Sequence, residues 1–133
     1  MNRKSLFSYN AFFIIFIFIL NFIANKLYLY SSLSYFDMIM HFLGGFWLGL
    51  FFFWYFYDKV FPKFPTKYFV YIMIGVFSIG LIWELYEIVV NASFAKDAFN
   101  LSDTISDLIC DTTGGLVSYF GLKRIIKSTE DSL

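Results

Sequence analysis

Four long runs of apolar residues follow one another along the chain, separated by short polar segments. The runs cover residues 6–24, 36–57, 68–90 and 104–122. Each is close to the roughly 20 residues that a helix needs to cross the hydrocarbon core of a bilayer. The last run is the least hydrophobic, and by hydropathy alone it also fits an interfacial or re-entrant segment. We predict four membrane-spanning helices, because the length of the last run and the charge distribution described below favour a fourth span.

The polar segments are typical of connections between helices. Residues 25–35 are polar and aromatic, residues 58–67 hold both prolines and three lysines, and residues 91–103 are rich in small polar side chains. Because proline breaks helices, we expect the chain to turn in the second of these segments. Ser102 or Asp103 is predicted to cap the fourth helix. No internal repeat is visible, so residues 1–133 are predicted to form a single four-helix membrane domain.

The composition supports an all-α polytopic membrane protein. Hydrophobic residues make up 59% of the chain, aromatic residues 25% and charged residues only 15%, whereas roughly 25% of a soluble domain is charged. Ten basic residues balance ten acidic ones, so there is no basic excess for binding nucleic acid. The single cysteine excludes an intrachain disulfide and a zinc site made only of cysteines. Membrane lipid is therefore the expected surrounding partner.

Basic residues are distributed unevenly around the four runs. Eight of them precede the first run, lie between the second and third, or follow the fourth, namely Arg3, Lys4, Lys59, Lys63, Lys67, Lys123, Arg124 and Lys127. Only Lys26 and Lys96 fall on the other side. Because cytoplasmic loops carry an excess of Lys and Arg, we predict that both termini are cytoplasmic. The first run is longer than the apolar part of a typical signal peptide and lacks a clear small-x-small cleavage site, so we expect it to be retained.

Ionisable residues occur in the last three runs, or directly before the fourth, and lie near one end of each. They are Asp37, His41, Glu84, Glu87, Asp103, Asp107 and Asp111. With the predicted topology all seven fall in the outer third of the bilayer, down to a depth of about 12 Å at about 1.5 Å per helical residue. Spacings of three and four place each set on one face of its helix. We predict that the three faces meet inside the bundle and open to the outer side.

This cluster of six carboxylates and one imidazole predicts a metal site. Six unpaired carboxylates cannot all stay ionised at low dielectric, so some are protonated or a cation lies among them. Carboxylate and imidazole ligands suit a divalent ion such as Mg, Mn or Zn. All seven residues are candidate ligands, and His41, Glu84, Glu87 and Asp107 are the candidate catalytic residues. A proton-sharing network is the alternative to a bound metal. For single residues, the alternatives are that Asp103 caps a helix and that Glu84 and Glu87 form a pair exposed to water at the rim.

Glycines on the same helices are expected to allow close packing. Gly45 and Gly49 form a GxxxG pattern in the second run. Gly75 and Gly80 lie in the third run, and Gly114 with its neighbour lies in the fourth.

These motifs resemble those of two families. The pattern consists of Asp37-x-x-x-His41-x-x-x-Gly45, then Glu84-x-x-Glu87, then Asp103-x-x-x-Asp107 followed by Gly114. It resembles the YjdF-type family of small bacterial inner-membrane proteins. It is also similar to the VanZ-like family, in which an Asp-x-x-x-His helix, a helix with Glu and an Asp-x-x-x-Asn-x-x-Gly helix occur in that order. The resemblance covers about residues 35–122 and implies a bacterial cytoplasmic membrane and functional roles for the matching positions.

The resemblance does not supply a reaction. The YjdF-type family has no established reaction, and the VanZ-like family is linked to glycopeptide (teicoplanin) resistance without a settled mechanism. This chain has Asp111 where the VanZ-like pattern has Asn, and it lacks the Gln that follows the Glu there. It is also shorter than a typical YjdF-type protein. Antibiotic resistance is therefore not carried over to it.

Three functions are compatible with the pattern. The first is a metal-dependent enzyme acting on a lipid or lipid-linked envelope substrate, in which the metal activates water or neutralises phosphate and His41 or a glutamate is the general base. The second is a proton- or cation-binding transport element, although the inner halves of the last three runs lack ionisable residues to complete a path. The third is a structural or accessory membrane subunit. A homo-oligomer that completes the site is compatible with all three.

Overall fold

A computed structural model describes residues 2–60, 63–90, 93 and 100–130. In these residues the chain forms helices α1 (Arg3–Lys26), α2 (Leu29–Ser32), α3 (Phe36–Tyr55), α4 (Tyr57–Val60), α5 (Thr66–Val90) and α6 (Leu101–Glu130). The described residues form no strand, and the predicted all-α fold is confirmed.

Three of these helices are long and apolar enough to cross a membrane. They are α1 with 24 residues, α3 with 20 and α5 with 25. Helix α6 has 30 residues, but among the described residues it is not apolar enough to count as a fourth such helix. Acidic residues in its first half and basic residues in its last turns lower its hydropathy. The four-span topology and the cytoplasmic location of the termini therefore remain predictions.

Two details at helix ends differ from the sequence expectations. Helix α6 begins at Leu101, so Ser102 and Asp103 lie in its first turn, and the prediction that one of them is the N-cap is wrong. The backbone N–H of Thr104 instead donates to the carbonyl of Asn100, 3.2 Å away. Helix α3 ends at Tyr55, two residues before the predicted end, and a short α4 follows. The predicted turn near the prolines falls partly on residues 61–62, outside the described residues.

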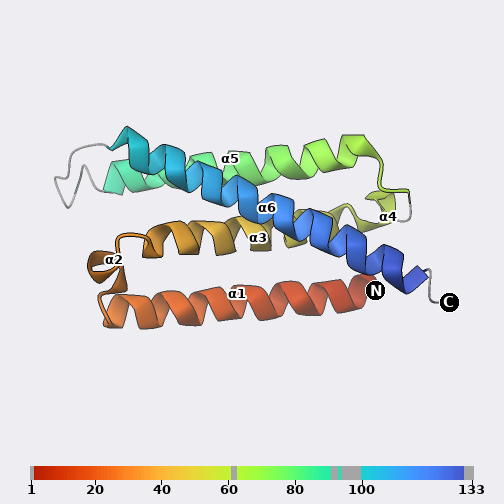
Figure 1. Ribbon diagram of the computed structural model, residues 1–133, viewed down its shortest axis with the longest axis horizontal. Helices are drawn as coiled ribbons and strands as arrows, with labels where there is room; N and C mark the ends of the chain where they lie inside the picture. Colours follow the sequence, from red (N-terminus) through yellow and green to blue (C-terminus); the bar gives the residue numbers. More distant parts are fainter. Residues whose placement is uncertain (1, 61–62, 91–92, 94–99, 131–133) are drawn as a thin grey trace.

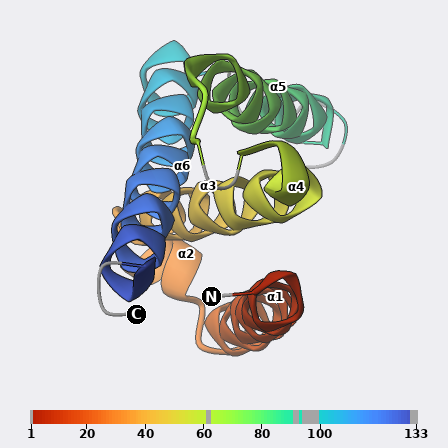
Figure 2. The same ribbon diagram turned by 90° about the vertical axis from the view of Figure 1, so that its right-hand side faces the viewer.

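Helix α3 occupies the centre of the bundle, in contact with α1, α5 and α6 (Figures 1 and 2). Its contact with α6, which crosses it obliquely, is the most extensive. Helix α1 lies on one side of α3 and α5 on the other (Figure 2). Both described ends of the chain and α4 lie at one end of the bundle, and α2 lies at the opposite end with the start of α6 (Figure 1).

Glycines allow the close approach of α3 and α6. A Cβ atom on Gly45 would overlap the backbone of Asp111, and one on Gly114 would overlap the carbonyl of Phe42. A Cβ on Gly49 would likewise overlap a side chain of α6. No side chain separates the two backbones at these points, and this contact brings the middle of α6 against the first half of α3.

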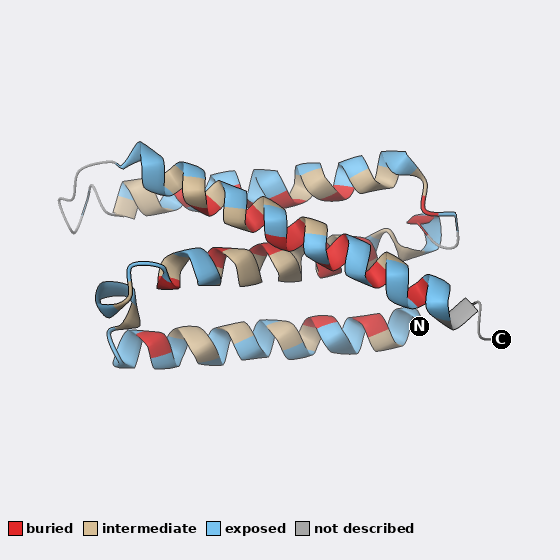
Figure 3. Cartoon of the chain, in the orientation of Figure 1, coloured by how far each residue is buried: buried red, intermediate tan, exposed pale blue. Residues whose placement is uncertain are grey.

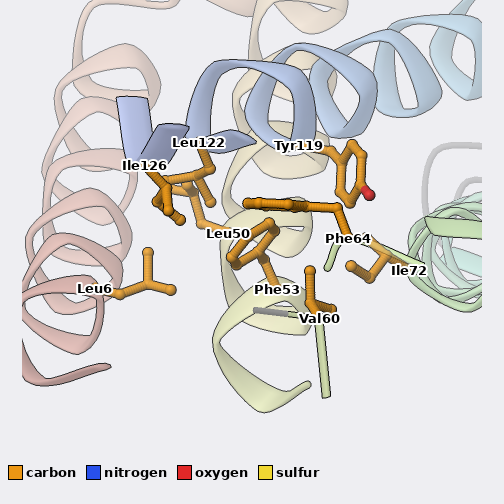
Figure 4. Packing of buried hydrophobic residues seen from close by; sticks show 9 residues of the cluster. All are labelled: Leu6, Leu50, Phe53, Val60, Phe64, Ile72, Tyr119, Leu122 and Ile126. Atoms are coloured by element: carbon orange, nitrogen blue, oxygen red, sulfur yellow. The ribbon is translucent and has the colours of Figure 1, made fainter. Parts of the chain in front are cut away.

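Apolar side chains fill the interior at the end of the bundle that holds the chain termini. The cluster consists of Leu6, Leu50, Phe53, Val60, Phe64, Ile72, Tyr119, Leu122 and Ile126 (Figure 4). The outward faces of α1 and α5 remain largely exposed (Figure 3) although they are apolar. Only 11% of the most hydrophobic window of α1 is buried. Apolar surface of this extent is what lipid covers in a membrane helix bundle.

Candidate metal centre

His41 lies at the centre of the acidic cluster and is surrounded by carboxylates from three helices. The residue is only 6% exposed. Its Nδ1 atom is 3.3 Å from Oδ2 of Asp111 on α6. On the other side of the ring, Nε2 is 3.6 Å from Oε1 of Glu84 on α5 and 3.9 Å from Oδ1 of Asp37, one turn earlier on α3. The structure thus brings together side chains that are up to 74 positions apart, which is the difference between residues 37 and 111.

Two groups of side chains offer ligand atoms within 4.8 Å of one another. One consists of Asp37, His41 and Asp107, and the other of His41, Glu84 and Glu87. Because bonds from a metal such as zinc to oxygen and nitrogen are about 2.0–2.2 Å long, separations of this size need only small side-chain movements to meet a shared ion. His41 belongs to both groups, so the five residues form one continuous donor set.

Two carboxylate oxygens in this set are buried without a hydrogen-bond partner among the described residues. Glu84 is 3% exposed and Asp107 is 2% exposed. Among the described residues, the oxygens without such a partner are Oε1 of Glu84 and Oδ1 of Asp107. Leaving a buried acceptor unpaired costs free energy, and a buried unpaired charge costs more. A cation or a proton is the partner that these atoms require.

The remaining predicted residues lie around this centre in different environments. Asp111 is buried beside His41. Asp37 is half-buried, with its side chain 33% exposed, and Glu87 is also half-buried. Asp103 is exposed in the first turn of α6 and belongs to neither group of potential ligands. The structure therefore brings six of the seven predicted residues together and leaves Asp103 outside.

Basic side chains do not compensate these carboxylates in the part of the chain that the structure describes. There, each ion pair of the cluster is formed with His41. The other described ion pair, between Arg3 and Asp58, lies at the opposite end of the bundle at 2.8 Å. The cluster is consequently rich in acceptors and poor in cations.

A groove of about 520 Å³ adjoins the cluster. Side chains of α1, α3 and α5 form its walls, and Asp37, His41 and Asp111 lie at its polar part. Tyr30 of α2 also lines it. Partial burial raises the pKa of the Tyr30 phenol above 10, and the carboxylates of Asp37 and Glu87 add to this effect.

Nearly the whole chain matches the model of a known family. The model of the family described as "Predicted membrane protein (DUF2238)" matches residues 1–128. The chain belongs to this family. Together with the apolar helices, this membership makes it an integral membrane protein. No curated protein and no solved structure matches the chain.

In this DUF2238 member, sequence reasoning missed several polar residues near the centre of the bundle. Asn10 is buried, and its Nδ2 donates to the carbonyl of Leu50, 3.3 Å away, while Trp47 Nε1 donates to the Asn10 carbonyl at 3.1 Å. Asn10 is one of two asparagines in the first apolar run, together with Asn21, and an amide side chain inside such a run is the signal that could have identified it. Tyr30 lies in residues 25–35, which the pattern predicted only as a connection, so nothing in the sequence placed it beside the acidic cluster.

Proposed function

We propose that this protein is a metal-dependent membrane enzyme that acts on the head group of a lipid or lipid-linked envelope substrate. The observation that carries the proposal is the position of Glu84 Oε1. This buried oxygen has no hydrogen-bond partner among the described residues and lies 3.6 Å from the Nε2 atom of His41. An ion placed between the two atoms would satisfy both.

The two nitrogens of His41 have different roles in this proposal: Nδ1 contacts the carboxylate that orients the ring, and Nε2 binds the metal. We assign the hydrogen on Nδ1 to the contact with Asp111, which would accept it. This tautomer leaves the lone pair of Nε2 directed at Glu84 and Asp37. A carboxylate that holds the far nitrogen of a metal-binding histidine is a recurrent arrangement in metalloproteins, where it sets the tautomer and raises the basicity of the ligand.

The donor set narrows the choice of metal. Imidazole suits Zn and other transition metals, whereas carboxylate oxygens suit Mg and Mn as well. One imidazole among several carboxylates favours Zn or Mn, with Mg as the third candidate. Bound at His41, the metal would supply Lewis acidity or an activated water. A carboxylate of the set that does not bind it, Glu87 or Asp107, would be within reach to act as general base.

The proposed topology has four spans with α6 as the last, both termini in the cytoplasm, and the metal centre in the outer third of the bilayer. The arrangement of helix ends supports this topology. Both described termini and α4 lie at one end of the bundle, and α2 and the start of α6 lie at the other (Figure 1). The basic residues gather near the first of these ends. At the opposite, outer end a lipid head group would have access to the centre. The relation to the YjdF-type family and the bacterial cytoplasmic membrane are parts of this proposal.

Metal analysis of the purified full-length protein tests the proposal first. We expect a stoichiometric divalent metal in the wild type after loading with Mg, Mn or Zn, and at least a tenfold loss of affinity in Glu84→Gln and in Asp107→Asn. Asp58→Asn is the matched control, because that carboxylate is exposed at the other end of the bundle and is expected to leave metal content unchanged. Absence of metal in the loaded wild type would refute the metal centre.

The same variants separate the enzyme from its alternatives. A metal-dependent enzyme requires that Glu84→Gln and Asp107→Asn each lose head-group turnover while the protein remains folded. A transport element predicts proton or cation flux in liposomes instead. A structural role predicts that both variants retain function and lose only thermal stability.

A further inference from the structure

The groove beside the metal centre has the properties of a binding site for a hydrocarbon chain. Its volume of about 520 Å³ lies within the range of about 300–1,000 Å³ that is typical of small-molecule sites. Apolar side chains of three helices line it, among them Ile17 and Phe18 of α1, Met40 and Leu48 of α3, and Ile79 of α5.

The groove is accessible from the surrounding membrane. Ile14 and Phe18 on one rim are 40% and 70% exposed, and Trp83 on the other rim is 54% exposed. Helix α1 and helix α5 stand on different sides of α3 (Figure 2). In a bilayer these exposed rims would contact lipid tails, so a chain has a lateral route into the groove that does not cross water.

Charge determines which head group fits at the polar part of the groove. Asp37 and Asp111 line it together with His41, and neither Lys nor Arg is among its described lining residues. Glu84, Glu87 and Asp107 add three carboxylates behind them. One divalent ion balances at most two of these five carboxylates, and the acceptor oxygens that remain favour a hydrogen-bond donor that carries a positive charge.

We infer that this groove binds a membrane amphiphile through a single hydrocarbon chain, with a positively charged amine of its head group beside Asp37 and Asp111. The inference deepens the proposed function and rests on it, because it names the class of substrate that the metal centre would act on. The chain lies along α3 between α1 and α5, and the amine-bearing head group meets the donor set around His41.

Gly44 offers a way to fill the groove without disturbing the bundle. A Cβ atom built on Gly44 comes no closer than 4.0 Å to another side chain, the Oδ1 atom of Asp111. Gly44→Leu therefore extends into the groove. Gly121 on α6 is the matched control, since a Cβ there meets nothing within 4 Å among the described residues and the residue is not part of the groove.

Quenching of tryptophan fluorescence by brominated amphiphiles tests the inference. Trp47 and Trp83 line the groove, whereas Trp54 contacts Arg3 and lies outside it, so the full-length Trp54→Phe protein in detergent reports the groove. The probes are an alkylamine and an alkyl phosphate, each with one chain brominated at its middle. We expect saturable quenching by the alkylamine, with at least a tenfold weaker apparent Kd in Gly44→Leu and no change in Gly121→Leu.

Metal content is measured in each sample, so that the two proposals can fail separately. Equal quenching in Gly44→Leu and Gly121→Leu overturns the groove as the binding site, whether or not metal is bound. Tighter binding of the alkyl phosphate than of the alkylamine overturns the amine. Loss of metal from the wild type refutes the proposed function instead. Leu48→Phe narrows the same groove from α3, and it decides the matter if Gly44→Leu does not fold.

Discussion

The two halves of α3 support two different kinds of interior. Around its first half, His41 contacts carboxylates from α3, α5 and α6. Two of the surrounding carboxylate oxygens lack a hydrogen-bond partner among the described residues. Around its second half, Leu50 and Phe53 pack against aliphatic and aromatic side chains of every other long helix. Among the described residues, the interior around the second half leaves only the neutral amide oxygen of Asn10 without a hydrogen-bond partner, whereas the first half leaves carboxylate oxygens that require a cation or protons.

The comparison shows that the residues that stabilise this small bundle and the residues with candidate chemistry lie at different ends of it. In lipid, helices associate mainly through close packing, because moving apolar surface from lipid to protein brings little hydrophobic gain. The packed end, with rings such as Phe53 and Tyr119 whose centroids are 5.8 Å apart, holds the helices in place. The acidic end can then keep polar atoms in positions that do not stabilise the apo fold.

The largest expected effect is the loss of stability in Phe53→Ala. This side chain is fully buried between Tyr119 and Phe64, and its removal leaves a cavity that costs about 3–5 kcal/mol. We expect a clear fall in unfolding temperature in detergent, with metal affinity unchanged at a temperature where the variant is folded. Tyr55→Ala on the same helix is the control, since Tyr55 is exposed. Loss of metal from the folded variant would contradict the separation of the two halves.

Next in size is the effect of Gly45→Ala on the contact between α3 and α6. The added methyl group would overlap the backbone of Asp111, which cannot move independently of α6. Overpacking of this kind costs about 1–3 kcal/mol, and here it would also displace Asp111 from His41. Gly44→Ala places the same methyl group one residue earlier, where the nearest atom is 4.0 Å away. Equal unfolding temperatures for the two variants would show that the helices are not packed as closely as described.

Asp111→Ala tests whether Asp111 orients His41 or binds the metal itself. Removal of a carboxylate that orients a metal-binding histidine lowers metal affinity by about 10–100-fold. We expect a loss of that size in Asp111→Ala and a smaller one in Asp111→Asn, because the amide oxygen can still accept the hydrogen of Nδ1. Titration calorimetry with the loaded metal measures both. Asp103→Asn is the control outside the donor set, and an affinity loss there as large as in Asp111→Ala would extend the centre to the first turn of α6.

The smallest effect is expected at the exposed ion pair between Arg3 and Asp58. Their side chains are 47% and 69% exposed, and exposed pairs contribute about 0–1 kcal/mol. Arg3→Ala should leave metal affinity unchanged and lower the unfolding temperature only slightly. Part of this small loss would come from the contact between Arg3 and the ring of Trp54, which the variant also removes. A drop as large as that of Phe53→Ala would mean that this end of the bundle depends on charge rather than on packing.

Much of the helical framework was predictable because apolar runs of this length have a single stable form in lipid. The structure places long helices over all four predicted runs, with most ends shifted by two or three residues and the end of α6 lying eight residues beyond the predicted one. The N-cap at Ser102 or Asp103 was predicted wrongly, since the helix begins one position before Ser102 and the cap choice depends on the preceding loop. The spacing of Asp37 and His41 predicted their common face, and their ion pair joins them across one turn.

Hydropathy and helical periodicity are local properties, so the amino-acid pattern was enough to predict the class of protein, the long helices and the ionisable residues that share one level of the bundle. Which atoms meet depends on how the helices pack. The azimuth of each helix and the backbone contact at Gly45 place Asp111 at Nδ1 of His41, bring Glu84 to Nε2 and leave Asp103 exposed. The groove likewise depends on the separation of α1 and α5 around α3, which no local pattern encodes.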